Sequence, residues 1–199
     1  MGILERKQRQ KEEVRGSILR AAWALVQAEG WQALSIRKIA DAIEYSVPVI
    51  YHHFENKEAI LHEFTKEGFR LLNTQLEEAK KKHLDPAKQL KEMAYAYWNF
   101  AFSNKEYYQL MYGLGMPTCE LVRQIPEVNK FSNTLQATIK DLIAASKNPE
   151  ADYFLKYHTY WSMLHGLISI NLTGRSKAPD KLNLSVLEDA VQGFIKNIE

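Results

Sequence analysis

The sequence predicts an all-α protein of about nine helices. Apolar residues recur at helical spacing along almost the whole chain. Strand signals are nearly absent, because there are no alternating β-branched runs and no Asn-Gly or Asp-Gly hairpin turns. Proline, glycine and capping side chains stand where the apolar stripes begin or end, which sets the expected helix boundaries.

Four helices are expected in the N-terminal part of the chain. The first carries an apolar stripe that starts at Val14, and Gly30 ends it because glycine tolerates the left-handed backbone. Ser35 is expected to cap the second helix and Asn56 the fourth, which extends over about 26 residues. The expected helices cover residues 14–29, 36–43, 47–54 and 57–82.

Five further helices are expected in the C-terminal part. Asp85-Pro86 begins the first of them, since proline fits the first helical turn, and Asn148-Pro149 ends another. The stretches GLGMPTC and GRSKAPDK are expected to be irregular. These helices cover residues 86–101, 105–112, 126–146, 150–173 and 185–197.

Charge and cysteine content point to a cytoplasmic protein with a polyanionic partner. Residues 1–38 hold eight Lys or Arg and four Glu, although the net charge of the chain is only +2. Cys119 is the one cysteine, so no internal disulfide forms. The N-terminus lacks a signal-peptide core, and the stretch 157–172 is too short and polar to span a bilayer.

The stretch SIRKIADAIEYSVPVIYHHFENKEAIL, residues 35–61, carries a break that a helix-turn-helix explains. Two short helices are separated by residues 44–46 and pack on the longer first helix. Ile50 and Phe54 are four apart and anchor the third helix inward. Its outer face then lies in the major groove of DNA, where hydroxyl and imidazole groups reach phosphates.

These residues resemble the signature of tetracycline-repressor-type (TetR) regulators over roughly 50 positions. The matching parts are the capping Ser35, the Ile39-Ala40 pair, the run 51–54 and Lys57-Glu58. The resemblance implies an N-terminal three-helix DNA-binding head and a C-terminal helical bundle for ligand binding and dimerisation. It implies phosphate contacts by Ser35, Arg37, Lys38, Tyr51, His53 and Lys57, and base contacts by Val47, Pro48 and His52.

Two departures from the family pattern affect this region. The family usually has glycine in the turn where this chain has Glu44-Tyr45-Ser46, and a left-handed non-glycine residue costs about 1 kcal/mol. Residues 47–49 read Val-Pro-Val in place of the usual Lys-Gly-Thr, which makes base readout mainly apolar. Purely structural roles stay open for Lys57, as a solvated first-turn residue, and for His53, as a core histidine packed on the first helix.

Aromatic residues are concentrated in the second half: 14 of 22 fall between Tyr95 and Trp161. Most suit a core, but buried tyrosine and tryptophan need partners for their polar groups, so some are expected to face a ligand. We expect an apolar pocket between the helices of residues 90–112 and 153–168, because bundles hold ligands between facing helices. The candidate lining residues are Tyr95, Trp98, Phe102, Tyr108, Met111, Tyr157, Trp161 and His165.

The segment Trp161 to Gly166 resembles the Trp-x-x-x-His-Gly (WHG) motif of one C-terminal domain type among these regulators. Trp161 and His165 share a helix face. His158 lies on that face too, but a metal pair lacks a third ligand at obvious spacing, so core or pocket histidines are favoured and no metal is expected. Cys119 is either a redox sensor or, as we favour, incidental.

The last helix carries apolar residues spaced 3, 4, 3 and 4 apart, the pattern of a coiled-coil seam. Such a seam either docks on its own domain or meets a second subunit, and a helix-turn-helix that reads a palindrome needs a partner. With part of the preceding helix it is expected to form a four-helix dimer interface, as in the family. The candidate interface residues are Ser162, Gly166, Ser169, Leu187, Val191, Phe194 and Ile198.

The favoured function is a ligand-responsive DNA-binding regulator, with residues 1–56 as the DNA-binding domain and 57–199 as the ligand-binding and dimerisation domain. A repressor that binds a palindromic operator as a homodimer, and that a small apolar or aromatic effector releases, is expected; no cofactor is. One alternative is a ligand- or partner-binding module without DNA binding, which Glu44 and Val47-Pro48-Val49 keep open. A small enzyme using His158 and His165 is less favoured, because no nucleophile elbow, phosphate loop or His-Glu-x-x-His motif is present.

Overall fold

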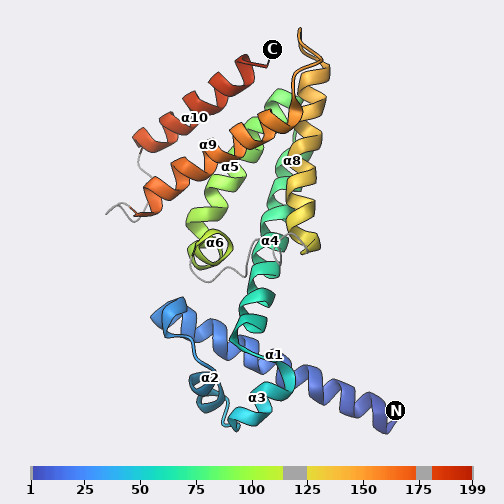
Figure 1. Ribbon diagram of the computed structural model, residues 1–199, viewed down its shortest axis with the longest axis vertical. Coiled ribbons are helices and arrows are strands. Elements are labelled where there is room, and N and C mark those ends of the chain that lie inside the picture. Colours follow the sequence, from blue (N-terminus) through green and yellow to red (C-terminus); the bar gives the residue numbers. More distant parts are fainter. Residues whose placement is uncertain (1, 114–124, 174–180, 199) are drawn as a thin grey trace. The chain divides into compact units, whose positions relative to one another are not determined.

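A computed structural model describes residues 2–113, 125–173 and 181–198 (Figure 1). Within these ranges the chain forms nine α-helices and one 3-10 turn and contains no strand, so the predicted all-α class is confirmed. The elements are α1 (Ile3–Glu29), η1 (Trp31–Ala33), α2 (Ile36–Ala42), α3 (Val47–His53), α4 (Lys57–Lys81), α5 (Pro86–Ser103), α6 (Lys105–Tyr112), α8 (Pro126–Ala144), α9 (Tyr153–Thr173) and α10 (Lys181–Lys196).

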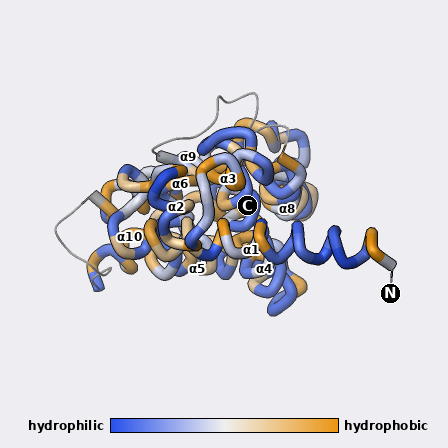
Figure 2. The backbone as a smooth tube through the Cα atoms, turned by 90° about the horizontal axis from the view of Figure 1, so that it is seen from below, coloured by the Kyte–Doolittle hydropathy of each residue, from blue (hydrophilic) through white to orange (hydrophobic). Residues whose placement is uncertain are grey.

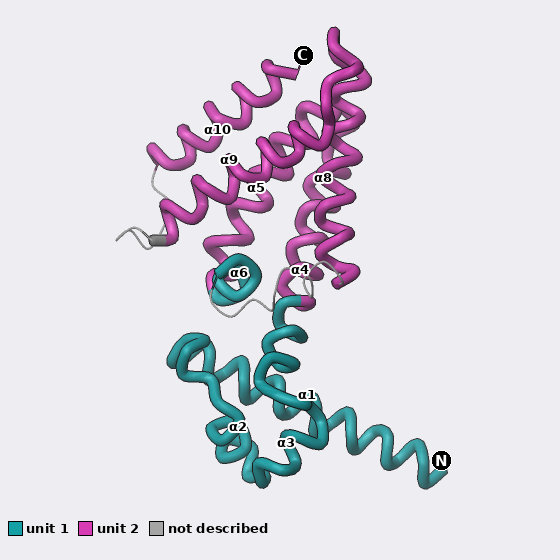
Figure 3. The backbone as a smooth tube through the Cα atoms, viewed as in Figure 1, with its two compact units in different colours: residues 1–65, 106–119 teal, residues 66–105, 120–199 magenta. Residues whose placement is uncertain are grey.

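Contacts divide the chain into two compact units (Figure 3). Unit 1 comprises residues 1–65 and 106–119, and unit 2 comprises residues 66–105 and 120–199. Helix α4 therefore contributes its first turns to unit 1 and the rest to unit 2. The functional boundary expected between residues 56 and 57 coincides with the start of α4, whereas the contacts divide within that helix.

Three helix starts follow from capping side chains, as predicted. The Ser35 Oγ accepts a hydrogen bond from the amide of Lys38 (3.2 Å) at the start of α2. The Oδ1 atoms of Asn56 and Asp85 accept from amides three and two residues further on, at 2.8 and 3.0 Å. Gly30 ends α1 with a positive φ of 80°, a conformation that glycine adopts without a Cβ clash.

Other boundaries differ from the expected ones. Helix α1 begins at Ile3 rather than near Val14, although its first turns are mostly hydrophilic (Figure 2). These turns have no buried stripe, and polar pairs one turn apart such as Gln8 Nε2 to Glu12 Oε1 (2.7 Å) support them instead. Helix α9 begins at Tyr153, because Asp152 Oδ1 accepts from the amides of the second and third residues after it.

Unit 1 has its own apolar core, made by α1, α2, α3, the first turns of α4 and α6. Ile18, Ile39 and Ile50 are fully buried there. Helix α6 joins this core through the Trp31 indole, whose Nε1 donates to the carbonyl oxygen of Glu106 (2.7 Å). The short helices α2 and α3 thus rest on a rigid base.

Unit 2 is a helical bundle in which α5, α8, α9 and α10 pack on one another. Tyr160 of α9 is fully buried, and its hydroxyl donates to the carbonyl oxygen of Leu90 at 2.5 Å. Burial raises the pKa of this phenol far above its usual value, so it stays neutral. A search of the described helices finds none that is long and apolar enough to cross a membrane.

Candidate nucleic-acid interface and binding core

Helices α2 and α3 are separated by a short turn in which one residue takes a left-handed conformation. Glu44 has a φ of 58°, the single positive φ among the described non-glycine residues. The amide of Tyr45 donates to the carbonyl oxygen of Ala40 (3.0 Å), which closes the turn. The turn therefore keeps the backbone that glycine favours even though glycine is absent.

Helix α3 divides its side chains between the core and the solvent as the spacing predicted. Ile50 is fully buried and Phe54, directly after the helix, is 4% exposed. Pro48 and His52 are exposed, and Tyr51 is 51% exposed, so aromatic and polar groups stand on the outer face. Val47 is half-buried at the first turn. This exposed face is suited to contacts with a groove of DNA.

The flanks of α3 carry the other residues assigned to phosphate. Ser35 is half-buried and caps α2, whereas Arg37 and Lys38 are exposed. The Nζ of Lys38 lies 2.6 Å from the Glu29 carboxylate at the end of α1. Lys57 is half-buried in the first turn of α4. These cations and hydroxyls are donors, which is what phosphate oxygens require.

His53 lies at the C-terminal end of α3 in a positively charged setting. Its ring is half-buried, and its Nδ1 is buried without a hydrogen-bond partner among the described residues. Burial lowers the pKa of His53, and the nearby charges of His52, Lys11 and Arg15 lower it further. His53 is therefore neutral near pH 7, and an approaching phosphate would favour its charged form.

The N-terminal half of α1 contributes a basic element that the motif analysis did not assign. Lys7, Gln10 and Lys11 of α1 line a groove together with His52 and His53 of α3. The excess of Lys and Arg before residue 38 was a signal for this region. The groove was not predicted because the helix was expected to begin near Val14, which left Lys7 and Lys11 without a place in the fold.

Arg15 has a structural position in unit 1. Its guanidinium lies 4.7 Å from the centre of the Phe54 ring and 3.1 Å from the Glu63 carboxylate. These contacts tie α1 to the residue that follows α3 and to α4. The orientation of α3 on α1 is thereby fixed from its C-terminal end.

The eight residues expected to line a pocket do not all come together. Tyr108 and Met111 are buried in the part of α6 that belongs to unit 1, and the other six lie in unit 2. Trp98 packs on Phe102 with ring centres 4.9 Å apart. The remaining unit 2 candidates are the half-buried Tyr95, the Tyr157 hydroxyl, which donates to Ser132 Oγ (3.1 Å), and the stacked pair Trp161 and His165 (5.3 Å).

Unit 2 encloses a small apolar space of about 190 Å³ that atoms leave unfilled. Trp161 is the one candidate from the expected set among its lining residues. Helix α8 supplies two of the walls, a role that aromatic density did not indicate, although its apolar residues at helical spacing did predict an inward face. The lining residues are Leu76, Met93, Tyr97, Phe131, Leu135, Trp161 and Leu164.

The candidate interface residues fall into two groups. Leu187, Val191, Phe194 and Ile198 are buried within unit 2 by their own chain, so this seam packs intramolecularly. Ser162, Gly166 and Ser169 lie on α9, exposed or half-buried. The same face of α9 carries two strongly exposed apolar residues, Leu155 at 61% and Ile170 at 70%. This set of α9 residues is called the α9 face below.

The histidines of α9 do not form a metal site. His158 is exposed beside Phe154 (ring centres 4.4 Å apart), and burial lowers the pKa of the half-buried His165. No group of three or more His, Cys, Asp or Glu that is able to hold a metal occurs among the described residues. Cys119 lies outside the described residues.

Solved structures share this fold over most of their length. A protein with unknown function from Rhodococcus sp. RHA1 is 21% identical, with 92% of this chain and 94% of that chain covered and a TM-score of 0.77. The TetR family transcriptional regulator PfmR from Thermus thermophilus is 22% identical, with 92% and 98% covered and a TM-score of 0.66. The transcriptional regulator FadR from Bacillus subtilis, in complex with stearoyl-CoA, is 22% identical, with 89% and 97% covered and a TM-score of 0.68. At such identities the likeness shows the fold.

Family models identify both parts of the chain, whereas no curated protein matches it. Residues 18–64 match the model of bacterial regulatory proteins, tetR family, and so include α2, α3 and the turn between them. Residues 90–192, more than half of the chain, match the model of the tetracyclin repressor-like C-terminal domain. The chain therefore belongs to the tetR family of bacterial regulatory proteins, which are ligand-responsive DNA-binding regulators of transcription and not enzymes.

Proposed function

We propose that this regulator is a homodimeric repressor that binds a palindromic operator and leaves it when a small, largely apolar or aromatic effector binds. The exposed outer face of α3 carries the proposal. Ile50 and Phe54 hold the helix inward, while Pro48, Tyr51 and His52 face the solvent. A helix of seven residues with such a face is suited to the major groove, and the protein then acts in the cytoplasm, where the chromosome lies.

The residues at the DNA divide into two roles. Ser35, Arg37, Lys38, Tyr51, His53 and Lys57 contact phosphates and position the head, and Val47, Pro48 and His52 face the bases. The exposure of Arg37, Lys38 and Tyr51 supports the first role. In the second role, Val47 and Pro48 read thymine methyl groups, since neither side chain donates a hydrogen bond. Residues 1–56 form the DNA-binding domain in this proposal.

Residues 57–199 bind the effector and a second copy of the chain. The α9 face supports dimerisation, because Leu155 and Ile170 are exposed on either side of Ser162 and Gly166. The small residues allow two α9 helices to approach closely, and the apolar residues bury against the partner. Two heads held about 34 Å apart then enter successive major grooves.

The effector acts through α4, the helix that contributes to both units. An effector that prefers one tilt of α4 changes the separation of the two heads and weakens operator binding. Such coupling is typically about 1–3 kcal/mol. The unit 2 candidates for effector contact are Tyr95, Trp98, Phe102, Tyr157, Trp161 and His165, and Tyr108 and Met111 complete the proposed set. Assignment of the C-terminal domain to the WHG type rests on the motif from Trp161 to Gly166, which the stacking of Trp161 on His165 supports.

The test is titration of the purified protein with duplexes selected from random DNA, repeated at several salt concentrations. We expect one duplex with two inverted half-sites to bind most tightly and the logarithm of affinity to fall linearly with the logarithm of salt. The double variant Tyr51→Ala, Lys57→Ala is expected to lose this binding. Salt-insensitive or absent binding to every duplex would contradict the proposal and favour a module that does not bind DNA.

A further inference from the structure

Asn73 of α4 is a polar residue buried in unit 2 with one acceptor left unused. The residue is 3% exposed, and its Nδ2 donates to the carbonyl oxygen of Glu127 (2.8 Å). Its Oδ1 has no hydrogen-bond partner among the described residues. The amide orientation is set by this contact, because the reverse orientation would place two acceptor oxygens against each other.

The partner residue, Glu127, also offers an unused acceptor. It lies in the first turn of α8, and its Oε2 is buried and has no hydrogen-bond partner within the described part of the chain. Folded proteins leave few buried polar atoms unpaired. Here two unpaired acceptors belong to residues that are hydrogen-bonded to each other, and one of them is a carboxylate.

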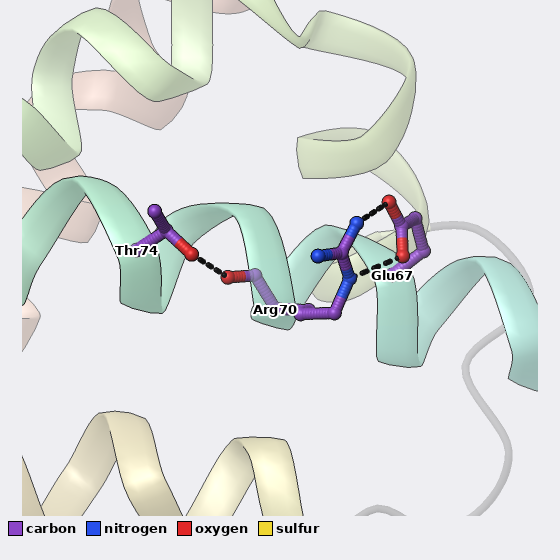
Figure 4. Close-up of polar contacts among 3 residues, drawn as sticks. All are labelled: Glu67, Arg70 and Thr74. Atoms are coloured by element: carbon purple, nitrogen blue, oxygen red, sulfur yellow. Dashed lines mark hydrogen bonds and ion pairs between the residues drawn. The ribbon is translucent and has the colours of Figure 1, made fainter.

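The cations near this pair are engaged with other acids. Lys130 of α8 places its Nζ 2.7 Å from the Glu77 carboxylate of α4. Arg70 donates two hydrogen bonds to Glu67 one turn away on α4, at 2.7 and 2.5 Å (Figure 4). None of the ion pairs among the described residues includes Glu127. The charge of its carboxylate is thus not neutralised by a neighbouring cation.

The unused acceptors lie one helical turn from the apolar space of unit 2. Leu76 follows Asn73 by three residues on α4, and Phe131 follows Glu127 by four residues on α8. Leu76 and Phe131 both line the space. Trp161 is its half-buried wall, whereas the other lining residues are fully buried, so a ligand enters most easily beside Trp161.

We propose that the effector is an aromatic or apolar amine, whose ammonium group donates to Asn73 Oδ1 and the Glu127 carboxylate while its apolar body fills the space beside Phe131 and Trp161. This inference rests on the proposed effector-binding function and names the class of effector. An ammonium has three donors and a positive charge, so it satisfies both acceptors and neutralises the carboxylate. A hydroxyl donates one proton, and a carboxylate ligand would meet two acceptors without a donor.

The experiment measures binding by isothermal titration calorimetry to the full-length protein, without DNA. The probes are phenethylamine, phenethyl alcohol and phenylacetate, followed by longer phenylalkyl chains with the same three end groups. We expect the amines to bind at least about tenfold more tightly than the alcohols, since hydrogen bonds to charged groups are the stronger ones. Carboxylates are expected not to bind. Equal binding of amine and carboxylate, or no binding of any amine, would overturn the proposal.

The variant Glu127→Gln keeps the size of the side chain and removes its charge. It is expected to weaken amine binding at least about tenfold and to change alcohol binding little. Glu78→Gln, at an exposed position of α4, is the matched control and should bind as the wild type does. Unchanged amine affinity in Glu127→Gln would contradict the proposal. If thermal unfolding shows that this variant is not folded, the ranking of end groups on the wild type decides.

Release of the operator is measured separately, so that the two proposals fail in different ways. Amines that bind at Asn73 and Glu127 but do not release the operator would support this site and count against the proposed effector function. Release by carboxylates, with no binding of amines, would overturn the amine proposal and leave the effector function intact.

Discussion

The Nζ of Lys38 lies 2.6 Å from the Glu29 carboxylate, so a proposed phosphate contact is paired with an acid of its own chain. Both side chains are about half-exposed, at 45% and 46%, and an exposed pair of this kind contributes less than about 1 kcal/mol. We expect Glu29→Gln to release Lys38 and to tighten operator binding by up to about fivefold. Fluorescence anisotropy with a labelled operator measures this gain.

The matched control introduces Glu29→Gln into a Lys38→Gln background. Without the ammonium, removal of the acid is expected to give little gain. Similar gains in both backgrounds would show that Glu29 repels phosphate directly and that Lys38 is not the group it restrains.

Glu44→Gly is expected to stabilise the protein. Glu44 has a φ of 58°, where a side chain costs about 1 kcal/mol relative to glycine. Urea denaturation should therefore show an unfolding free energy higher by about 1 kcal/mol, whereas Glu44→Ala, which keeps the strain, should stay within about 0.5 kcal/mol of the wild type. A gain of equal size in both variants would assign the effect to the carboxylate charge.

Local signals predicted much of the fold because they act within one turn of a helix. Ser35, Asn56 and Asp85 accept hydrogen bonds from amides two or three residues away, so each is visible in a short stretch of sequence. The early start of α1 at Ile3 was not predicted, since its first turns face solvent and carry no apolar stripe.

The candidate site in unit 2 was harder to predict because it depends on contacts between distant segments. Asn73 and Glu127 are 54 residues apart, and each looks like an ordinary surface residue in the sequence. The spacing of Leu187, Val191 and Phe194 predicted an apolar stripe correctly, but spacing does not distinguish the chain's own core from a partner subunit.

Tyr51→Ala and Pro48→Ala are expected to affect operator recognition differently. Tyr51 is exposed and its hydroxyl reaches a phosphate, so its loss should weaken all duplexes by a similar factor and leave sequence preference unchanged. Pro48 faces the bases, so its loss should change affinity by about 1–3 kcal/mol at some base pairs only. Binding to a set of single-base operator variants measures both, and the same pattern for the two would contradict the division of roles.

Stability should fall as the solution becomes acidic, in part because of His53. Its pKa in the folded protein is lowered from 6.5, chiefly by burial and then by His52, Lys11 and Arg15. Below about pH 6.5 the unfolded chain therefore binds a proton that the folded protein does not, and the unfolding free energy decreases as pH falls. Above that pH both states are neutral and His53 has no effect.

The measurement compares urea denaturation of the wild type and His53→Gln between about pH 7.5 and pH 5. The variant should lose less stability over this range. Part of the dependence is expected to remain, because burial lowers the pKa of His165 as well, with the same sign. An identical pH dependence in wild type and variant would show that His53 does not contribute.

A bulky residue at Gly166 is expected to break the dimer without unfolding the protomer. No atom of the chain lies within 4 Å of a Cβ built at Gly166, so Leu fits within the protomer. In the proposed dimer the same side chain would separate the two α9 helices, since close approach depends on small residues there. Analytical ultracentrifugation should show a monomer for Gly166→Leu, and operator affinity should fall because a single head reads one half-site.

Gly193→Leu on α10 provides the matched control. Gly193 also has no atom within 4 Å of a built Cβ, and it lies outside the α9 face. Both variants replace a helical glycine, which favours the helix by a few tenths to about 1 kcal/mol, so both should be at least as stable as the wild type when protomer unfolding is compared. A dimer that survives Gly166→Leu but dissociates with Gly193→Leu would place the interface on α10 instead of the α9 face.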